Sequence, residues 1–190
     1  MSWAVRAIIV LVGMSPAMAL AQWQAKQAAQ ESEPSEFYPD DWNRGFDEAD
    51  PPSDAVLDAL LKTREANENA DRLKGFDREG LRKLFRVVRV HLAGTGEADE
   101  VVLGLFPMSG ADCDWFWVVR DRGDRVRVIL FTNEDGIYLL NTKTNGYREI
   151  RGVWSSGAGY SITRLYRYDG TTYTLAYERT RQELLPRAKQ

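Results

Sequence analysis

The stretch that decides the fold class runs from residue 125 to residue 154 and reads RVRVILFTNEDGIYLLNTKTNGYREIRGVW. Polar and apolar side chains alternate from Arg125 to Val128 and an apolar run continues to Phe131, which is typical of a strand with a buried face. Asn145-Gly146 suits a tight hairpin because both residues tolerate positive φ angles. We therefore expect consecutive strands that are joined by short turns.

The same pattern extends outward in both directions, with short connections between the apolar runs. Turn residues occupy Asn133-Glu134-Asp135-Gly136 and Asp169-Gly170. Because such gaps leave no room for crossover helices, the strands are expected to pair antiparallel. We predict a mainly β domain over 84–180, an eight-stranded antiparallel meander that forms a barrel or a sandwich. The expected strands are 85–92, 101–106, 115–119, 125–131, 137–140, 147–154, 161–168 and 172–177.

One amphipathic helix is expected ahead of the β domain. Capping residues and prolines at 50–53 precede apolar positions that share one helical face. Lys74-Gly75 provides a stop, so the helix should cover about 53–74. Asp77 can cap a short second helix, and the helical segment is therefore 53–83. The apolar positions of the first helix are Val56, Leu57, Leu60 and Leu61.

The first 21 residues have the three parts of a secretory signal peptide. A basic start at Arg6 is followed by an apolar run from Ala7 to Met14 and a small-residue exit at Ala19-Leu20-Ala21. The apolar run is shorter than the roughly 20 residues that span a bilayer. We expect cleavage after Ala21, a periplasmic or secreted mature protein, no membrane span after cleavage, and a C-terminal tail over 181–190.

The composition excludes several function classes. Of 190 residues, 44% are hydrophobic and 28% are charged, as in soluble globular domains. A single Cys and a single His exclude an intrachain disulfide and metal sites that need several such ligands. His91 has no orienting acid beside it in the sequence, so no catalytic triad is expected. The net charge of −3 lacks the basic signature of nucleic-acid binding, and we predict no cofactor and no nucleic-acid partner.

An acidic arm over 22–52 precedes a basic body. Residues 22–60 carry two basic and ten acidic residues, whereas residues 61–190 carry 22 basic and 18 acidic ones. The arm is rich in Gln, Ala, Ser, Pro and acids, which predicts a largely disordered segment. Aromatic residues interleave with these acids, so the arm can alternatively lay its rings on the β domain or dock on a partner. They are Phe37, Tyr38, Trp42 and Phe46.

One pair of acids offers a catalytic alternative. Asp112 and Asp114 are two residues apart, which places both on one face of an extended backbone. Paired carboxylates serve as acid and base in glycoside hydrolysis, so the alternative function is a cell-wall glycan or peptide hydrolase. Cys113 lies between them, and the flanking carboxylates should raise the pKa of its thiol. We expect a buried, inert Cys113.

The loop Leu92-Ala93-Gly94-Thr95-Gly96-Glu97-Ala98-Asp99-Glu100 looks like a degraded calcium loop. Ala93 and Thr95 stand where carboxylates are expected. Glu97, Asp99 and Glu100 remain as oxygen ligands. We predict no metal site and leave open whether these three acids bind a cation.

The order of these elements resembles a recurring type of small secreted bacterial β-domain, over roughly 85–178. The resemblance rests on the loop 92–100, on Gly110–Cys113, on Thr144–Ile150 and on Tyr166–Tyr173. The loop is similar to the acidic glycine loop of FG-GAP/VCBS repeats. Residues 156–160 are similar to a loop of periplasmic lysozyme inhibitors, whose disulfide cysteines this chain lacks. The resemblance implies a secreted β-domain and assigns no activity.

Arginines and aromatic residues along the later strands can build a binding face for a partner. The residues that we expect to contact it are Trp154, Ser156, Tyr160, Tyr166 and Arg167. Export, a β body and the lack of an assembled catalytic group together predict a non-catalytic binding or inhibitory domain of the bacterial envelope that recognises a protein. A hydrolase and a structural envelope protein are the alternatives.

Overall fold

The computed structural model describes residues 35–38, 45–94, 96, 98–110, 113–123, 125–156 and 159–182. The expected signal peptide, residues 22–34 and 39–44 of the arm, and residues 183–190 of the tail lie outside these ranges. The described residues all belong to one compact unit, residues 34–190.

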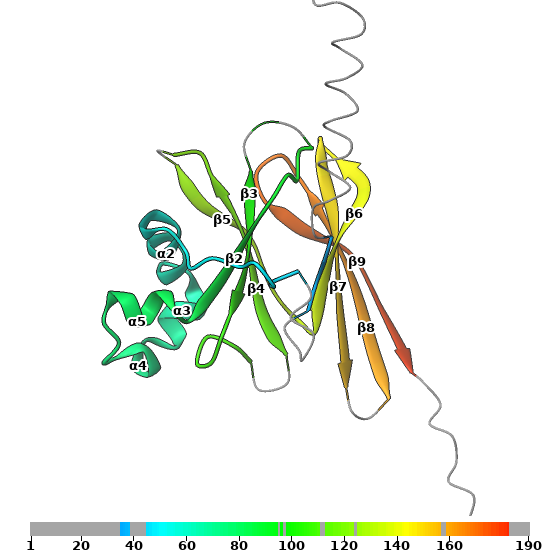
Figure 1. The fold of residues 1–190 in the computed structure, drawn as a ribbon. Helices are drawn as coiled ribbons and strands as arrows, with labels where there is room; N and C mark the ends of the chain where they lie inside the picture. Colours follow the sequence, from blue (N-terminus) through cyan, green and yellow to red (C-terminus); the bar gives the residue numbers. More distant parts are fainter. Residues whose placement is uncertain are drawn as a thin grey trace, which may run out of the picture. The chain divides into compact units, whose positions relative to one another are not determined.

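Two antiparallel sheets form the body (Figure 1). The four-stranded sheet has the order β2 (Phe85–Val90), β3 (Asp99–Gly104), β4 (Asp114–Asp121) and β5 (Val126–Glu134). The five-stranded sheet has the order β1 (Glu36–Phe37), β6 (Gly136–Thr144), β7 (Tyr147–Ser156), β8 (Tyr160–Tyr168) and β9 (Tyr173–Gln182). The sheets do not close into a barrel. The prediction of a mainly β, antiparallel meander is confirmed, in the form of a sandwich.

The chain passes from one sheet to the other at Asp135. This residue alone separates β5 from β6, which belong to different sheets and do not pair. The turn expected over 133–136 is therefore a corner and not a hairpin. Gly136 does not have a positive φ angle. Glycine is needed at this position because a Cβ would collide with the ring of Tyr38.

The tight hairpin turns have the predicted backbone. Asn145 and Gly146 join β6 to β7 with φ angles of 50° and 81°, the left-handed pair that a type I′ turn needs. Gly170 has a φ of 108° in the turn between β8 and β9. In that turn Asp169 accepts hydrogen bonds from the backbone N–H groups of Thr171 and Thr172.

Two apolar clusters join the layers of the fold, one between the two sheets and one between the four-stranded sheet and the helices. The first lies between the sheets and includes Phe37, Phe46, Phe116, Ile150 and Tyr173. The second lies on the other face of the four-stranded sheet, where buried residues of the helices pack with the strands; it includes Leu57, Leu60, Phe85, Trp117 and Val119. Figure 1 shows the helices beside the four-stranded sheet, on the side away from β6–β9.

Three short helices replace the single helix that the sequence predicts over 53–74, and a fourth corresponds to the predicted short second helix. They are α2 (Asp54–Leu61), α3 (Arg64–Glu68), α4 (Ala70–Leu73) and α5 (Arg78–Arg82). The break after α2 falls at Thr63, whose extended backbone and hydroxyl cap the N-terminus of α3. Ser53 caps α2, and Asp77 caps α5 as predicted.

The described part of the arm is docked on the body. Phe37 and Phe46 are fully buried with ring centroids 5.4 Å apart, and Phe46 stacks on Phe116 at 6.4 Å. β1 pairs with β6, and Asp50 forms a bridge with Val87 of β2. The arm thus contacts both sheets, and the expectation of disorder over 22–52 is wrong for residues 35–38 and 45–52, because their aromatic side chains fill the core.

Within the part of the chain that the structure describes, no helix combines the length and the apolar character needed to cross a membrane.

Candidate functional site

β9 is an edge strand. It pairs with β8 along its length, from Tyr160 opposite Gln182 to Tyr168 opposite Tyr173, and no other described strand pairs with it. Tyr173 is buried and its hydroxyl donates to the carbonyl of Arg148 at 2.7 Å. Residues 174–182 are all exposed. We call residues 174–182 the β9 edge.

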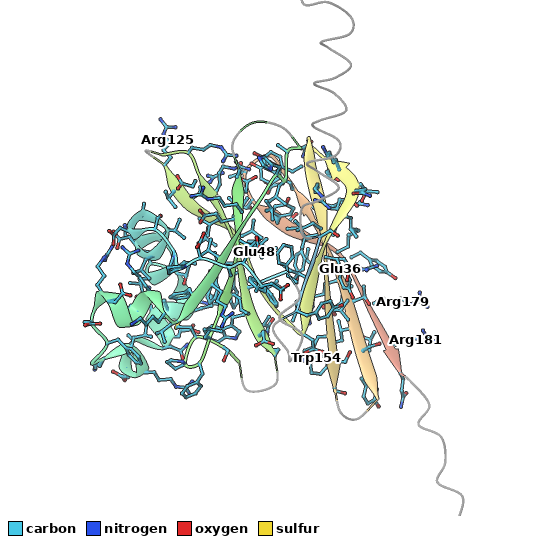
Figure 2. All side chains as sticks on the ribbon, viewed as in Figure 1. Glu36, Glu48, Arg125, Trp154, Arg179 and Arg181 are labelled. Atoms are coloured by element: carbon cyan, nitrogen blue, oxygen red, sulfur yellow. The ribbon has the colours of Figure 1, made fainter. Side chains whose placement is uncertain are left out.

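The β9 edge carries uncovered apolar and basic groups. Leu175 and Tyr177 each expose 53% of their surface. Arg179 lies opposite Thr163 and Arg181 opposite Ser161, two short β8 side chains that carry no charge. Figure 2 shows both arginines on the outer side of β9, and neither forms an ion pair with the described residues. The edge is therefore locally positive.

Strand alternation gives the β9 edge two faces. A bulge between Leu165 and Tyr166 resets the register, and beyond it Tyr177, Arg179 and Arg181 point to one side of the sheet. Glu178 points to the other side, where its carboxylate accepts from Arg164 Nε at 2.7 Å. The acid of β9 is thus paired on the inner face of the sheet, where its side chain is still 44% exposed, and the two arginines of β9 face outward.

A buried carboxylate holds β8 against the four-stranded sheet. Glu134 of β5 is fully buried, and its Oε1 accepts from Thr132 at 2.8 Å, from Tyr166 at 3.0 Å and from Arg164 at 3.2 Å. Gly152 makes room for it, because a Cβ there would overlap the Glu134 carboxylate. Burial, together with the negative charge of Glu134, raises the pKa of Tyr166 to about 12. The Tyr166 hydroxyl therefore remains a hydrogen-bond donor at neutral pH.

The end of the β7–β8 hairpin adds aromatic surface beside the β9 edge. Trp154 lies opposite Ile162 and Ser156 lies opposite Tyr160. Tyr160 is 41% exposed, its backbone N–H donates to Ser156 Oγ at 3.3 Å, and its hydroxyl accepts from Gln182 at 3.1 Å. Trp154, Ser156 and Tyr160 are three of the five predicted contact residues, and the fold brings them together. Figure 2 places Trp154 at this end of β7.

The other two predicted contact residues lie elsewhere. Tyr166 is buried in the core and bonded to Glu134, so it supports the strand from inside. Arg167 points to the opposite side of β8, as its position next to Tyr166 requires. There its Nε donates to Glu149 at 2.8 Å. The five residues therefore do not form one surface.

The residues of the β9 edge are not among the contact residues predicted from the sequence. The last expected strand ends at Tyr177, whereas β9 continues to Gln182. The available signal was the alternation itself. Tyr177, Arg179 and Arg181 continue the period of two through a charged segment that has the composition of a tail.

Of the two acids of the alternative hydrolase, Asp112 and Asp114, the structure describes only Asp114. Asp112 lies outside the described residues. Asp114 begins β4, opposite Glu134 of β5. Burial is the main factor that raises the pKa of the Cys113 thiol; a hydrogen bond from Asn133 opposes it, and the charge of Asp114 adds to it. The raised pKa agrees with the expectation of an inert thiol. The expected burial is met only in part, because Cys113 is half-buried.

The acids of the loop 92–100 do not converge. Glu97 lies outside the described residues. Asp99 is fully buried between the sheets, where Arg122 is 3.0 Å and Arg120 is 3.7 Å from its Oδ1. Glu100 is the next residue of β3 and faces the other side of the sheet, toward Arg89. Among the described residues, no group of three or more metal-binding side chains can hold an ion.

Comparisons of the chain with protein-family models, with curated proteins and with solved structures found no match. The geometry of the β9 edge and of the hairpin end beside it is therefore the basis for inferring a function.

Proposed function

We propose that this chain is an exported, non-catalytic binding domain of the bacterial envelope that recognises a protein through the β9 edge and the adjoining end of the β7–β8 hairpin. The observation that supports this most strongly is the exposure of the whole run 174–182 on a strand that pairs on one side with β8 and on the other side with no described strand. Leu175 and Tyr177 expose more than half of their surface within that run.

An edge strand of this length is a liability in a free protein, because its backbone groups can pair with other chains. Native proteins protect such strands by covering or shortening them, or with bulges and charged side chains. The described part of β9 is long and uncovered. Tyr and Arg occur on the β9 edge and Trp154 occurs at the adjoining hairpin end, and all three residue types are enriched where proteins bind proteins. A protein partner therefore fits these residues better than a small molecule.

The buried carboxylate also favours binding over catalysis. Glu134 is fully buried, and three donors already occupy its Oε1. A catalytic acid needs contact with its substrate. Glu134 instead orients Arg164 and Tyr166, which fix β8 and thereby β9.

Export follows from the sequence of residues 1–21 and is part of the proposal. N-terminal sequencing of the protein recovered from the periplasm or the medium should give Gln22 as the first residue. A mature protein that still begins at Met1 or Ser2 would contradict export by a cleaved signal.

Binding is tested by capture from envelope extract on the immobilised mature chain. The test variant is Tyr160→Ala with Tyr177→Ala, and the control variant is Phe76→Ala with Phe106→Ala, which removes two exposed rings outside the β8–β9 region. We expect one protein to be retained by the wild type and by the control. The test variant should bind that purified protein about tenfold more weakly or worse. Equal affinity of all three chains for every retained protein would contradict the proposal.

A further inference from the structure

We propose that the β9 edge binds its partner by strand addition, and that the added strand is an acidic segment with the order acid-x-acid-x-apolar. This inference rests on the proposed function and specifies the chemistry of the partner.

The backbone of β9 provides the length that strand addition needs. Ten residues at about 3.3 Å per residue give an edge of roughly 30 Å. β8 satisfies one side of β9, and among the described strands none pairs with the other side. In strand addition, main-chain hydrogen bonds supply affinity and alternate side chains supply specificity.

The side chains on the outer face specify the sequence of the added strand. Tyr177, Arg179 and Arg181 share that face, and residues directly opposite one another in a sheet also share a face. Opposite charges stabilise such cross-strand pairs, so an acid is favoured opposite each arginine and an apolar residue opposite Tyr177. An antiparallel strand meets Arg181 first and Tyr177 last, which gives the order acid-x-acid-x-apolar.

The same charges disfavour a second copy of this chain as the added strand. If the C-terminal halves of two β9 strands pair antiparallel, Arg179 and Arg181 of one copy face those of the other. Like charges directly opposite are destabilising. Glu178 does not offset them, because it points to the other face and is paired with Arg164.

Ion pairs of Arg164 on the inner face hold β9 in place and leave its free edge open to an added strand. Arg164 contacts both Glu178 of β9 and the buried Glu134 of β5. This arrangement ties the middle of β9 to the core through side chains on the inner face. The outer face and the free backbone edge therefore stay available without any rearrangement of β8.

The test uses short, end-blocked synthetic peptides and the full mature chain, with affinity measured by calorimetry. The first peptide has glutamate at both acid positions, valine at the apolar position and threonine elsewhere. The second replaces both glutamates with lysine. The third keeps the glutamates and carries N-methyl groups on alternate residues, which remove backbone donors on one edge. We expect the first peptide to bind and the other two to bind at least about tenfold more weakly.

A matched pair of variants tests the two arginines. The double variant Arg179→Gln with Arg181→Gln should bind the glutamate peptide about 2- to 30-fold more weakly than the wild type. This is the range expected for the loss of two cross-strand charge pairs. Arg72→Gln with Lys74→Gln removes two exposed positive charges near α4 and should leave the affinity unchanged. Because residues 179 and 181 are exposed, circular dichroism should show the same thermal unfolding for both variants.

Three results would overturn the inference. The glutamate peptide fails to bind, the lysine or N-methylated peptide binds equally well, or sedimentation shows a dimer that the glutamate peptide does not dissociate. The last result would make a second copy the occupant. If capture of the partner still depends on Tyr160 and Tyr177 while the peptide fails, strand addition is wrong and the binding function stands. If capture does not depend on them, the proposed function also fails.

Discussion

Glu134 of β5 and Arg164 of β8 form an ion pair between the two sheets, with 3.2 Å between Oε1 and Nη1. The glutamate side chain is fully buried and the arginine side chain is 21% exposed. Arg164 also contacts Glu178, so a single guanidinium links the core to the edge strand. The pair explains how an exposed strand such as β9 is held in place from one side.

Replacing Glu134 should destabilise the fold strongly. Glu134→Gln removes the charge while it keeps the volume, and it leaves Arg164 partly buried with a weaker partner. We expect a loss of about 2 to 4 kcal/mol in the free energy of unfolding, measured with urea at neutral pH. The control is Glu178→Gln, whose side chain is 44% exposed and whose loss should be less than about 1 kcal/mol. Similar small losses for both variants would contradict a structural role for the buried pair.

Gly152 should not tolerate a methyl group while Glu134 is present. A Cβ at this position overlaps the Glu134 carboxylate, so Gly152→Ala should cost about 1 to 3 kcal/mol of stability. The clash is specific to one neighbour and can be isolated by a double-mutant cycle. In a Glu134→Ala background the same substitution should cost clearly less. An equal cost in both backgrounds would assign the effect to the backbone of β7.

The strands follow from sequence patterns, whereas their division between two sheets does not. Alternation and Asn-Gly turns locate the strands from 85 to 177 because both are local properties. Asp135-Gly136 has the same composition in a corner as in a hairpin. In the corner, Gly136 packs against Tyr38, a contact from far away in the sequence that local composition does not reveal. The break at Thr63 is similar, since a threonine can either continue a helix or cap the next one.

Phe46 should be essential for stability even though it lies in an acidic, proline-containing segment. Its ring is fully buried between Phe37 and Phe116, so Phe46→Ala should cost about 3 to 5 kcal/mol. Urea unfolding measures this loss, with Phe76→Ala as the control because Phe76 is 42% exposed. Limited proteolysis should cleave the Phe46→Ala chain within 45–52 faster than the wild type. Unchanged unfolding and cleavage would mean that the arm is not docked.

The outer face of the five-stranded sheet should contribute a pH-dependent part of the stability. Glu149 accepts hydrogen bonds from Thr144, Thr142 and Arg167, and these contacts lower the pKa of its carboxyl below the ordinary value of 4.5. A lowered folded-state pKa gives stability that is present above the unfolded pKa and is lost as the pH falls through the folded pKa.

The free energy of unfolding of the wild type should therefore exceed that of Glu149→Gln by about 1 to 3 kcal/mol at neutral pH. The difference should shrink as the pH falls below about 4.5. Urea unfolding of both chains at several pH values checks this. A difference that stays constant or grows toward low pH would contradict the assigned contacts.

The candidate site could be predicted in part. The hairpin end at Trp154, Ser156 and Tyr160 follows from the glycine-containing loop between two strands. The separation of Tyr166 from Arg167 also follows from the strand period of two. The burial of Tyr166 could not be predicted, because it depends on Glu134 of the opposite sheet. The extension of β9 beyond Tyr177 was not predicted, because the residues that alternate there are charged and have the composition of a tail.

Amide hydrogen exchange with the captured partner tests the central claim most directly. The full mature chain is compared alone and saturated with the purified partner. We predict that exchange slows by at least about tenfold along 174–182, because an added strand protects the free backbone edge of β9. The backbone of α2 and α5 should be unaffected. Unchanged exchange along 174–182, with new protection on the helices or near Phe106, would contradict the account.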